Sequence, residues 1–420
     1  MRNLIWLRSR SGRVSMGFLV AVVLCCVAVT AGRGTIVNAG GAVEGGDTFR
    51  VLAPIQSGNL LLFPVVRGNG KAGPGTPFLT LDEGLKNGSV EVTEAGKVRG
   101  LVRHRDNGPA ILSDHGFGDR VNTLVLVNNS NQPLLLLAGE IVTGGKQDRV
   151  IAKDRIVPPG GDPMDLSVFC IEPGRWVESS AAFGASARGA TNSIMVQPTV
   201  RERAMVAKDQ QQVWDSVHGS IAAVRAAPAP ASAGPMLAAP PPSNTSYATA
   251  MQSQEFSAKV DDAAAPVMKA REAIVAQLKK EGAVGVVVAV RGEIVWADLF
   301  ASTDLLSRYW TKLVRSYAAE SLNPGETHAA PTVADAQRFL VSPSGGTETS
   351  EGSVGIYRYR ELNSGGTETF VLESLLPDAK YDVHISKLKV RNVERRPRPI
   401  SYRPVPPPII PPVPVEPIPK

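Results

Sequence analysis

Short apolar runs separated by Gly and Pro dominate the first 180 residues of the chain. Runs of this length are typical of buried strands, and we place strands at residues 51–54, 59–66, 90–94, 123–128 and 134–137. Thr80 and Glu83 have the spacing of a helix capping box, so a short helix is expected within residues 79–86. The first part of the chain is therefore predicted to be β-rich.

The densest strand pattern lies between residues 133 and 176. A run of four leucines ends at Gly139, a turn-rich segment follows up to Arg149, and two further apolar runs are predicted to be strands at 150–157 and 164–171. This stretch also carries most of the unusual polar residues of the chain. If the protein has a ligand site, we expect it here.

After residue 200 the apolar positions recur at helical spacing. One helix is expected over residues 200–225 and a second over 248–281, with a possible break at Pro266. The residues between them, 226–245, are rich in Pro and Ala and are predicted to be a linker.

Residues 284–300 have the clearest hairpin pattern in the chain, with two β-rich runs around a turn at Arg291 and Gly292. Ser302 or Thr303 is expected to cap a helix that ends near residue 321. The polar side of this helix carries the basic residues Arg308, Lys312 and Arg315. A solvated helix face is the simpler interpretation, and a phosphate-binding surface is the alternative.

The remaining C-terminal residues are predicted to form a short helix at 333–341 and a last strand at 383–390. The hexapeptide SGGTET occurs at 344–349 and again at 364–369. Two copies are too few for a solenoid, so we interpret them as glycine-led turns between strands.

These patterns predict an α+β fold for residues 48–390. We expect a β-sandwich-like N-terminal half at 48–180, a helical middle with a linker, and a C-terminal hairpin and helix at 248–325 that pack back on the sheet. Strands at 326–390 would complete the domain.

Both ends of the chain differ from this body. Four arginines precede an apolar run, which predicts a signal peptide over residues 1–31 and export to a periplasmic or extracellular location. The uncharged run 14–32 is also long enough to remain as a membrane anchor. Residues 32–47 are expected to be flexible, and 391–420 form a basic, proline-rich tail with polyproline II character.

The formal net charge of +6 is concentrated at these ends. Subtracting the leader and the basic C-terminal end leaves the body at about −4, so no nucleic-acid partner is expected. Cys25 and Cys26 lie in the leader, which leaves Cys170 as the one cysteine of an exported chain. On an apolar strand it is predicted to be a buried, unreactive thiol.

Known chemical motifs are missing from the sequence. GEIVTGGK resembles a phosphate-binding loop but has one residue too many, and Gln147 replaces the hydroxyl residue that would hold Mg²⁺. No spacing suggests a metal site, so no cofactor is expected. The candidate binding residues are the polar and aromatic side chains of the 133–176 stretch: Glu140, Lys146, Gln147, Arg149, Glu172, Arg175 and Trp176.

Three functions are compatible with this set. The leading hypothesis is a non-catalytic domain that binds a small anionic or phosphorylated ligand, or a protein partner, at the loops around Lys146 and Arg175. A hydrolase would use Glu140 and Glu172 as acid and base, which requires the two carboxylates to lie within about 10 Å. The third is an envelope scaffold tethered through the proline-rich tail. Oligomeric state is not indicated by the sequence.

Several stretches resemble one protein family. GEIVTGGKQDR, IVPPG and VFCIEPGRW, with LTLDEGL upstream and QVWDSV, VGVVVAVRGEIVWADLF, WTKLVRSYA and VHISKL downstream, are similar to the ARG and rhodanese-phosphatase-superfamily-associated protein domain. The resemblance covers roughly residues 51–388. It implies a β-rich domain with helical insertions and no assigned reaction, and its characteristic polar positions are the seven candidate residues above. Asp148 departs from the asparagine common there, and residues 104–118 resemble an insertion.

Overall fold

The computed structural model of the protein describes residues 35–36, 49–67, 77–94, 101–102, 111–112, 123–173, 180, 183–184, 194–228, 246–269, 271–341 and 346–390. The predicted leader and the proline-rich tail lie outside these residues, as do all but two residues of 32–47 and all of the linker after residue 228. Within the described residues, no helix combines the length and the apolar character needed to cross a membrane.

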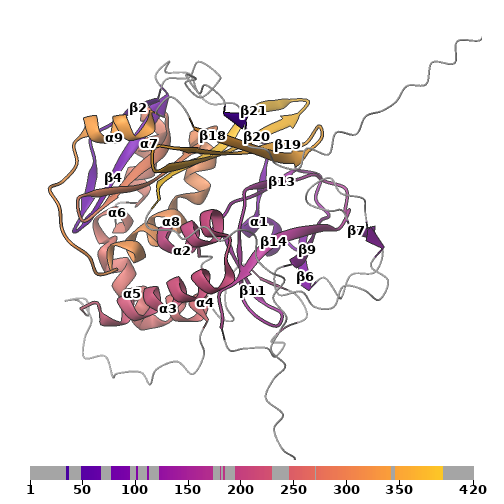
Figure 1. Cartoon of the computed structure of the whole chain (residues 1–420), viewed down its shortest axis with the longest axis horizontal. Coiled ribbons are helices and arrows are strands. Elements are labelled where there is room, and N and C mark those ends of the chain that lie inside the picture. The colour runs from indigo at the N-terminus through magenta and orange to yellow at the C-terminus, as the bar shows by residue number, and fades with distance from the viewer. Residues whose placement is uncertain are drawn as a thin grey trace, which may run out of the picture. The chain divides into compact units, whose positions relative to one another are not determined.

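A ten-stranded sheet is the largest element, and all of its neighbouring strands run antiparallel (Figure 1). It joins strands from both ends of the described chain. Its order is β1 (Thr35–Ile36), β18 (Thr347–Ser353), β19 (Tyr357–Ser364), β20 (Thr367–Leu376), β21 (Ala379–Lys389), β17 (Glu293–Phe300), β16 (Ala283–Val290), β4 (Leu60–Arg67) and β2 (Phe49–Val51), and β3 (Ile55–Ser57) also pairs with β4.

Three smaller sheets contain the strands between residues 79 and 184. One has the order β13 (Arg155–Val157), β10 (Leu134–Leu136) and β5 (Leu79–Thr80). The second has the order β15 (Phe183–Gly184), β11 (Ile141–Gly144), β12 (Arg149–Ile151), β14 (Met164–Cys170), β9 (Thr123–Asn128) and β6 (Val90–Glu94), and the third pairs β7 (Leu101–Val102) with β8 (Ile111–Leu112).

The two long helices expected in the middle of the chain are each divided. The first becomes α2 (Pro198–Glu202), a π-helical turn (Arg203–Ala207) and α3 (Gln210–Ala226), because Lys208 adopts a left-handed conformation with φ of 53°. The second becomes α4 (Tyr247–Gln252), α5 (Gln254–Ala263), α6 (Ala265–Lys269) and α7 (Arg271–Glu281).

The break expected at Pro266 is present, since α5 ends at Ala263 and α6 begins at Ala265. Pro266 lies in the first turn of α6, where its missing N–H would have no intrahelical partner. The earlier break falls at Ser253, whose side chain accepts a hydrogen bond from the backbone N–H of Phe256 and so caps α5.

The other helices agree well with the sequence patterns. α1 (Leu81–Lys86) begins with the expected capping box, in which Thr80 and Glu83 satisfy each other's backbone N–H groups, so that prediction is confirmed. α8 (Thr303–Ser321) is capped by Ser302, and α9 is the short helix Val333–Leu340. The second SGGTET copy supplies the turn between β19 and β20, as expected.

Both faces of the ten-stranded sheet are covered, which explains the continuous apolar run of β16. Val286 and Val288 belong to the core shared with α8, whereas Val287 and Ala289 belong to a second core that includes Ala336 of α9. Because successive side chains of a strand point to opposite faces, a strand covered on both sides is apolar throughout. Figure 1 shows α8 and α9 beside these strands.

The hairpin β16–β17 joins the N-terminal strands edge to edge. Val288 pairs with Leu62 of β4 on one side of the hairpin, and Leu299 pairs with Ile385 of β21 on the other. The N-terminal strands β2 to β4 therefore belong to the same sheet as the C-terminal strands, whereas the sequence analysis had assigned them to the N-terminal half and had expected the hairpin to pack back on them.

Two glycines test this packing. Gly285 of β16 lies so close to β17 that an added Cβ would overlap the backbone oxygen of Asp298, whereas a Cβ at Gly219, exposed in α3, would meet no atom within 4 Å. Gly285→Ala should therefore lower the free energy of unfolding by about 1 to 3 kcal/mol. Gly219→Ala should raise it by about 0.5 to 1 kcal/mol. Urea denaturation measures both, and equal effects would contradict the strand packing.

Candidate functional site

The hairpin of β11 and β12 carries most of the predicted site residues, and it is buried almost throughout. Its turn needs glycine, since Gly144 and Gly145 have φ values of 130° and 51°. A Cβ on Gly145 would also overlap the ring of Phe183 and come within 2.7 Å of Glu94. The turn is thus fixed in position by its neighbours, and so is the adjoining Lys146.

Glu140, just before β11, is 1% exposed and forms a buried ion pair. Its Oε1 accepts a hydrogen bond of 2.5 Å from Lys312 Nζ of α8, which also donates to Asp82 Oδ2 of α1 at 2.7 Å. Its Oε2 accepts the backbone N–H of Leu137 at 2.7 Å. Both carboxylate oxygens of Glu140 are therefore engaged by donors within the fold.

The electrostatics of this pair follow from burial. Burial raises the pKa of Glu140, and the opposing effect of Lys312 only partly cancels it. Burial lowers the pKa of Lys312, but Glu140 and Asp82 outweigh this effect and the net shift is upward. Lys312 is thus held as a cation between two carboxylates, which connects α8 with α1 and the start of the hairpin.

Glu172, Gln147 and Arg149 meet at the other end of the hairpin. Glu172 Oε2 accepts the backbone N–H of Asp148 at 3.1 Å, and Gln147 Nε2 donates to the backbone oxygen of Glu172 at 3.0 Å. Arg149 Nη1 donates to the backbone oxygen of Gln147 at 2.5 Å, and its Nη2 lies 3.8 Å from Glu94 Oε1. All five of these residues are buried.

The two candidate carboxylates lie at opposite ends of this hairpin. The backbone oxygen of Glu140 accepts the N–H of Ile151 in β12, whereas the Glu172 carboxylate accepts the N–H of Asp148, three residues earlier in the chain. At roughly 3.3 Å per residue, the backbone positions are about 10 Å apart along the strand. The Glu140 side chain accepts hydrogen bonds from Leu137 and Lys312, whereas the Glu172 side chain accepts one from Asp148.

Lys146 is the half-buried residue of the turn, and its backbone N–H donates to Glu94 Oε1 at 3.0 Å. Arg175 and Trp176, the remaining predicted site residues, lie outside the described residues. The structure therefore brings Gln147, Arg149 and Glu172 together next to Lys146, and it puts Glu140 in a different network.

A second buried network contains residues that the sequence analysis did not select. Arg201 of α2 binds Asp298 of β17 through two hydrogen bonds of 2.9 and 3.1 Å, and Ser386 of β21 donates to Asp298 at 2.7 Å. Tyr317 of α8 also donates to Asp298. His384 lies 2.7 Å from Asp154 Oδ2 through Nδ1 and 3.2 Å from Asp298 Oδ1 through Nε2.

Every charged member of this network is 0% exposed, so we call Asp154, Arg201, Asp298 and His384 the buried charge cluster. Burial alone would lower the pKa of His384, but the two carboxylates raise it to about 9. Burial would raise the pKa of Asp298, but Arg201 and His384 bring it well below its usual range. Two cations therefore face two carboxylates at neutral pH.

The sequence contained a clue to these residues, but the clue was the family resemblance and not a motif with characteristic spacing. Asp298, Tyr317 and His384 lie in the stretches WADLF, WTKLVRSYA and VHISKL, which carry the family resemblance. Their positions in the chain are far apart, so no motif of local spacing connects them. A resemblance distributed over distant polar positions was the available clue.

The basic stripe of α8 is not a solvated face, and that prediction was wrong. Lys312 and Arg315 are buried, and each basic residue of the stripe has an acidic partner from another element: Arg308 with Glu83, Lys312 with Asp82 and Glu140, and Arg315 with Asp261. The helix is covered on this side by α1 and α5, so the basic side chains form internal ion pairs that hold α8 to its neighbours.

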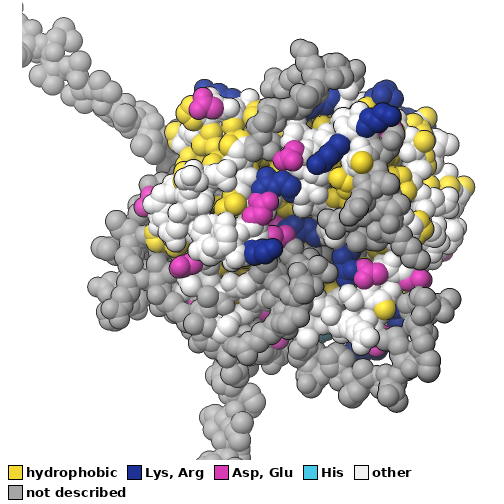
Figure 2. Space-filling view, turned by 180° about the vertical axis from the view of Figure 1, so that it is seen from behind, with side chains coloured by type: hydrophobic (Ala, Val, Ile, Leu, Met, Phe, Trp, Pro, Cys, Tyr) yellow, Lys and Arg dark blue, Asp and Glu magenta, His cyan; other side chains and the backbone are white. Residues whose placement is uncertain are grey.

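Other chemistry is limited in the described part of the chain. Cys170 is buried and burial raises the pKa of its thiol to about 12, which agrees with the expected unreactive thiol. In the same described residues, no group of three or more His, Cys, Asp or Glu side chains could hold a metal ion. On the face seen in Figure 2, basic and acidic side chains are interspersed and form no patch of one sign.

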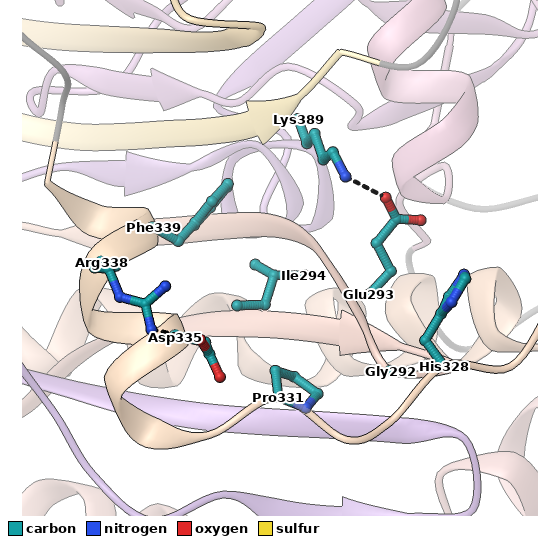
Figure 3. Close-up of a pocket in the computed structure, with 9 residues that line it drawn as sticks. All are labelled: Gly292, Glu293, Ile294, His328, Pro331, Asp335, Arg338, Phe339 and Lys389. Atoms are coloured by element: carbon teal, nitrogen blue, oxygen red, sulfur yellow. Dashed lines mark hydrogen bonds and ion pairs between the residues drawn. The ribbon is translucent and has the colours of Figure 1, made fainter.

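A surface groove of about 620 Å³ lies between α9, the turn of β16–β17 and the end of β21 (Figure 3). Ile294 and Phe339 form its apolar floor, and Pro331 lies beside them. Two ion pairs of 2.7 Å form its rim, Glu293 with Lys389 and Asp335 with Arg338. No residue predicted from the sequence lines this groove.

The described residues thus define a β-rich α+β domain in which most charged candidates are bound into internal networks. A comparison with protein families matches residues 48–388 to the ARG and Rhodanese-Phosphatase-superfamily-associated Protein domain. The match covers most of the chain, so the protein belongs to this family, and the resemblance found in the sequence is confirmed. Comparisons with curated proteins and with solved structures found no match.

The Lys312 network predicts a large effect of removing one partner. Lys312→Met leaves Glu140 buried without its cation and should lower the free energy of unfolding by about 3 to 5 kcal/mol. Adding Glu140→Gln should restore part of this loss, because it removes the unpaired charge. The control Arg358→Met breaks the half-exposed pair with Glu373 and should cost less than about 1 kcal/mol. Urea unfolding measures all three, and similar losses in both single variants would contradict the assignment.

His384 predicts a pH dependence of stability. Its pKa is about 9 in the folded protein and near 6.5 when unfolded, so its contribution is complete below pH 6.5 and is lost as the pH rises to 9. The free energy of unfolding should fall by up to about 3 kcal/mol over this range. Lys387, with a pKa lowered to about 8 by burial, acts in the opposite sense only above pH 8.

Chemical unfolding at pH 6, 7.5 and 9 tests this expectation. His384→Gln should lose the decrease between pH 6 and 8, whereas His218→Gln, which changes an exposed histidine of α3, should retain it. A wild-type free energy of unfolding that stays constant from pH 6 to pH 8 would show that His384 is not held as a cation.

Proposed function

We propose that this protein is an exported, non-catalytic binding domain that takes a small anionic ligand or an acidic protein partner at the end of the hairpin β11–β12. We call this the hairpin-end site and define it by Lys146, Gln147, Arg149 and Glu172. Arg175 and Trp176, which follow Glu172 closely in sequence, are proposed to complete it. Export is carried by the N-terminal sequence pattern.

The observation that carries the non-catalytic part of the proposal is the engagement of both candidate carboxylates. An acid and base pair needs two carboxylates that face one substrate and exchange protons with it. Glu140 instead accepts from Lys312 and Leu137, and Glu172 accepts from Asp148 in another network. This arrangement supports a structural role for both groups and weakens the hydrolase alternative.

The anionic ligand is supported by the way the turn presents its basic residue. Lys146 follows two glycines with positive φ, and its backbone N–H is bonded to Glu94, so its position is set before any ligand arrives. Arg149, three residues further along the chain, is buried and donates a hydrogen bond to the backbone oxygen of Gln147. A preorganised site loses little conformational entropy on binding.

The layout proposed for the domain follows from this assignment. The β-rich half, residues 48–180, would carry the ligand, and the helix at 200–225 and the segment 248–325 would support it. Lys312 reaches Glu140 at the base of the hairpin, and Gln210 bonds both backbone groups of Cys170 on the strand beside it. The linker at 226–245, the strands of 326–390 and the tail would not take part in binding.

Thermal unfolding with inorganic phosphate or pyrophosphate tests the proposal, with sodium chloride at equal ionic strength as the reference. A ligand that binds only the folded state at one hundred times its Kd adds about 2.7 kcal/mol of stability, which is readily seen as a higher Tm. Lys146→Ala should abolish this increase. Lys280→Ala, at an exposed position near the end of α7, should retain it. An unchanged Tm in the wild type, or an equal response of both variants, would contradict an anion site at Lys146.

A further inference from the structure

The surface groove beside α9 has the composition of a site for an extended, proline-rich segment. Domains that bind polyproline II helices offer shallow grooves with aromatic or apolar floors, into which proline rings pack. Here Phe339 of α9 and Ile294 of β17 form such a floor, and both remain half-buried in the described protein. The volume of about 620 Å³ lies in the range of specific ligand sites.

The rim of the groove supplies carboxylates that can accept basic side chains. Glu293 and Asp335 face it, and each is now paired with a basic residue whose side chain is more than half exposed, Lys389 and Arg338. Exposed pairs of this kind contribute little to stability, so an incoming arginine can replace either basic partner at low cost. A segment that combines proline with arginine therefore matches both parts of the groove.

The chain itself contains such a segment immediately after the groove. Lys389 lines the groove and is the last residue of β21, and residues 391–420 follow directly. This tail has six Lys or Arg against Glu394 and Glu416, and its prolines begin at Pro397. The eight Cα–Cα steps from Lys389 to Pro397 can span up to about 28 Å, which is enough to turn back to the groove.

We propose that the proline-rich C-terminal segment, residues 397–420, docks as a polyproline II helix in the groove formed by α9, β17 and the end of β21. Proline rings contact Phe339 and Ile294, and tail arginines pair with Glu293 and Asp335. The high effective concentration of a tethered segment favours this contact over binding in trans. The body has a net negative charge and the tail a net positive charge, so their electrostatic attraction also favours docking.

This inference goes beyond the proposed anion site and is independent of it. Docking would cover the α9 face of the large sheet, so a partner that competes for the groove would release the tail. The tail would then be available for a second partner, which makes the groove a point of control.

Photocrosslinking in the full-length protein tests the docking. Arg338, on the rim and 76% exposed in its side chain, is replaced by the photoreactive amino acid benzoylphenylalanine. After irradiation, mass spectrometry should find adducts within residues 397–420 of the same chain. The same probe at Val354, which is 88% exposed in the β18–β19 turn and outside the groove, should give at least five-fold fewer tail adducts.

Charge reversal provides the matched pair of variants. With the probe at position 338, Glu293→Arg should lower the adduct yield several-fold, because it puts a positive charge on the rim that faces the basic tail. Glu373→Arg, which disrupts the surface pair with Arg358 away from the groove, should leave the yield unchanged. Far-UV circular dichroism confirms that both variants fold.

A mixture of isotope-labelled and unlabelled chains distinguishes contacts within one chain from contacts between two. Adducts within one chain that depend on Glu293 support the proposal. The absence of tail adducts, equal adducts from the Val354 probe, or adducts only between labelled and unlabelled chains would each overturn it.

Discussion

The buried charge cluster of Asp154, Arg201, Asp298 and His384 is the interaction on which the rest of the structure depends. Its members come from four separate parts of the chain: the segment after β12, α2, β17 and β21. A buried charge without its partner costs several kcal/mol of folding free energy. Moving any one of these elements away from the others would therefore be strongly destabilising. Arg201 also lies over the ring of Trp296, at 4.4 Å from the centroid, which adds a cation–π contact to the ion pair.

This cluster also positions the candidate site. Asp154 accepts the backbone N–H of Ala138, and Gly139 lies so close to Arg201 that a Cβ would overlap the arginine side chain. The residues that precede β11 are thus in direct contact with the buried charge cluster. From there the chain enters Glu140 and the hairpin, whose far end presents Lys146. Large-sheet residues and hairpin residues are therefore coupled through a short path of direct contacts.

The distribution of charge is the reason why we propose a binding role for this domain rather than a catalytic one. Catalytic groups must reach a substrate, whereas the acidic and basic candidates described here largely reach each other. Both proposed sites, half-buried Lys146 and the groove beside α9, lie where polar groups of the described residues are open to solvent. They lie on different elements, so the two proposals are independent of each other.

Local sequence determined most of the secondary structure, because capping residues, turn glycines and apolar periodicity act over a few residues. Thr80 with Glu83 fixed the start of α1, Ser302 capped α8, and the run 284–300 specified its hairpin. The resemblance carried by the same chain also identified the family. Tertiary structure decided which charges meet. Lys312, which the helical periodicity had placed on a solvated face, pairs with Glu140, 172 residues away, and His384 meets Asp154 across 230 residues. Such pairs form because tertiary folding buries distant elements against each other. A pattern of neighbouring residues carries no information about that contact.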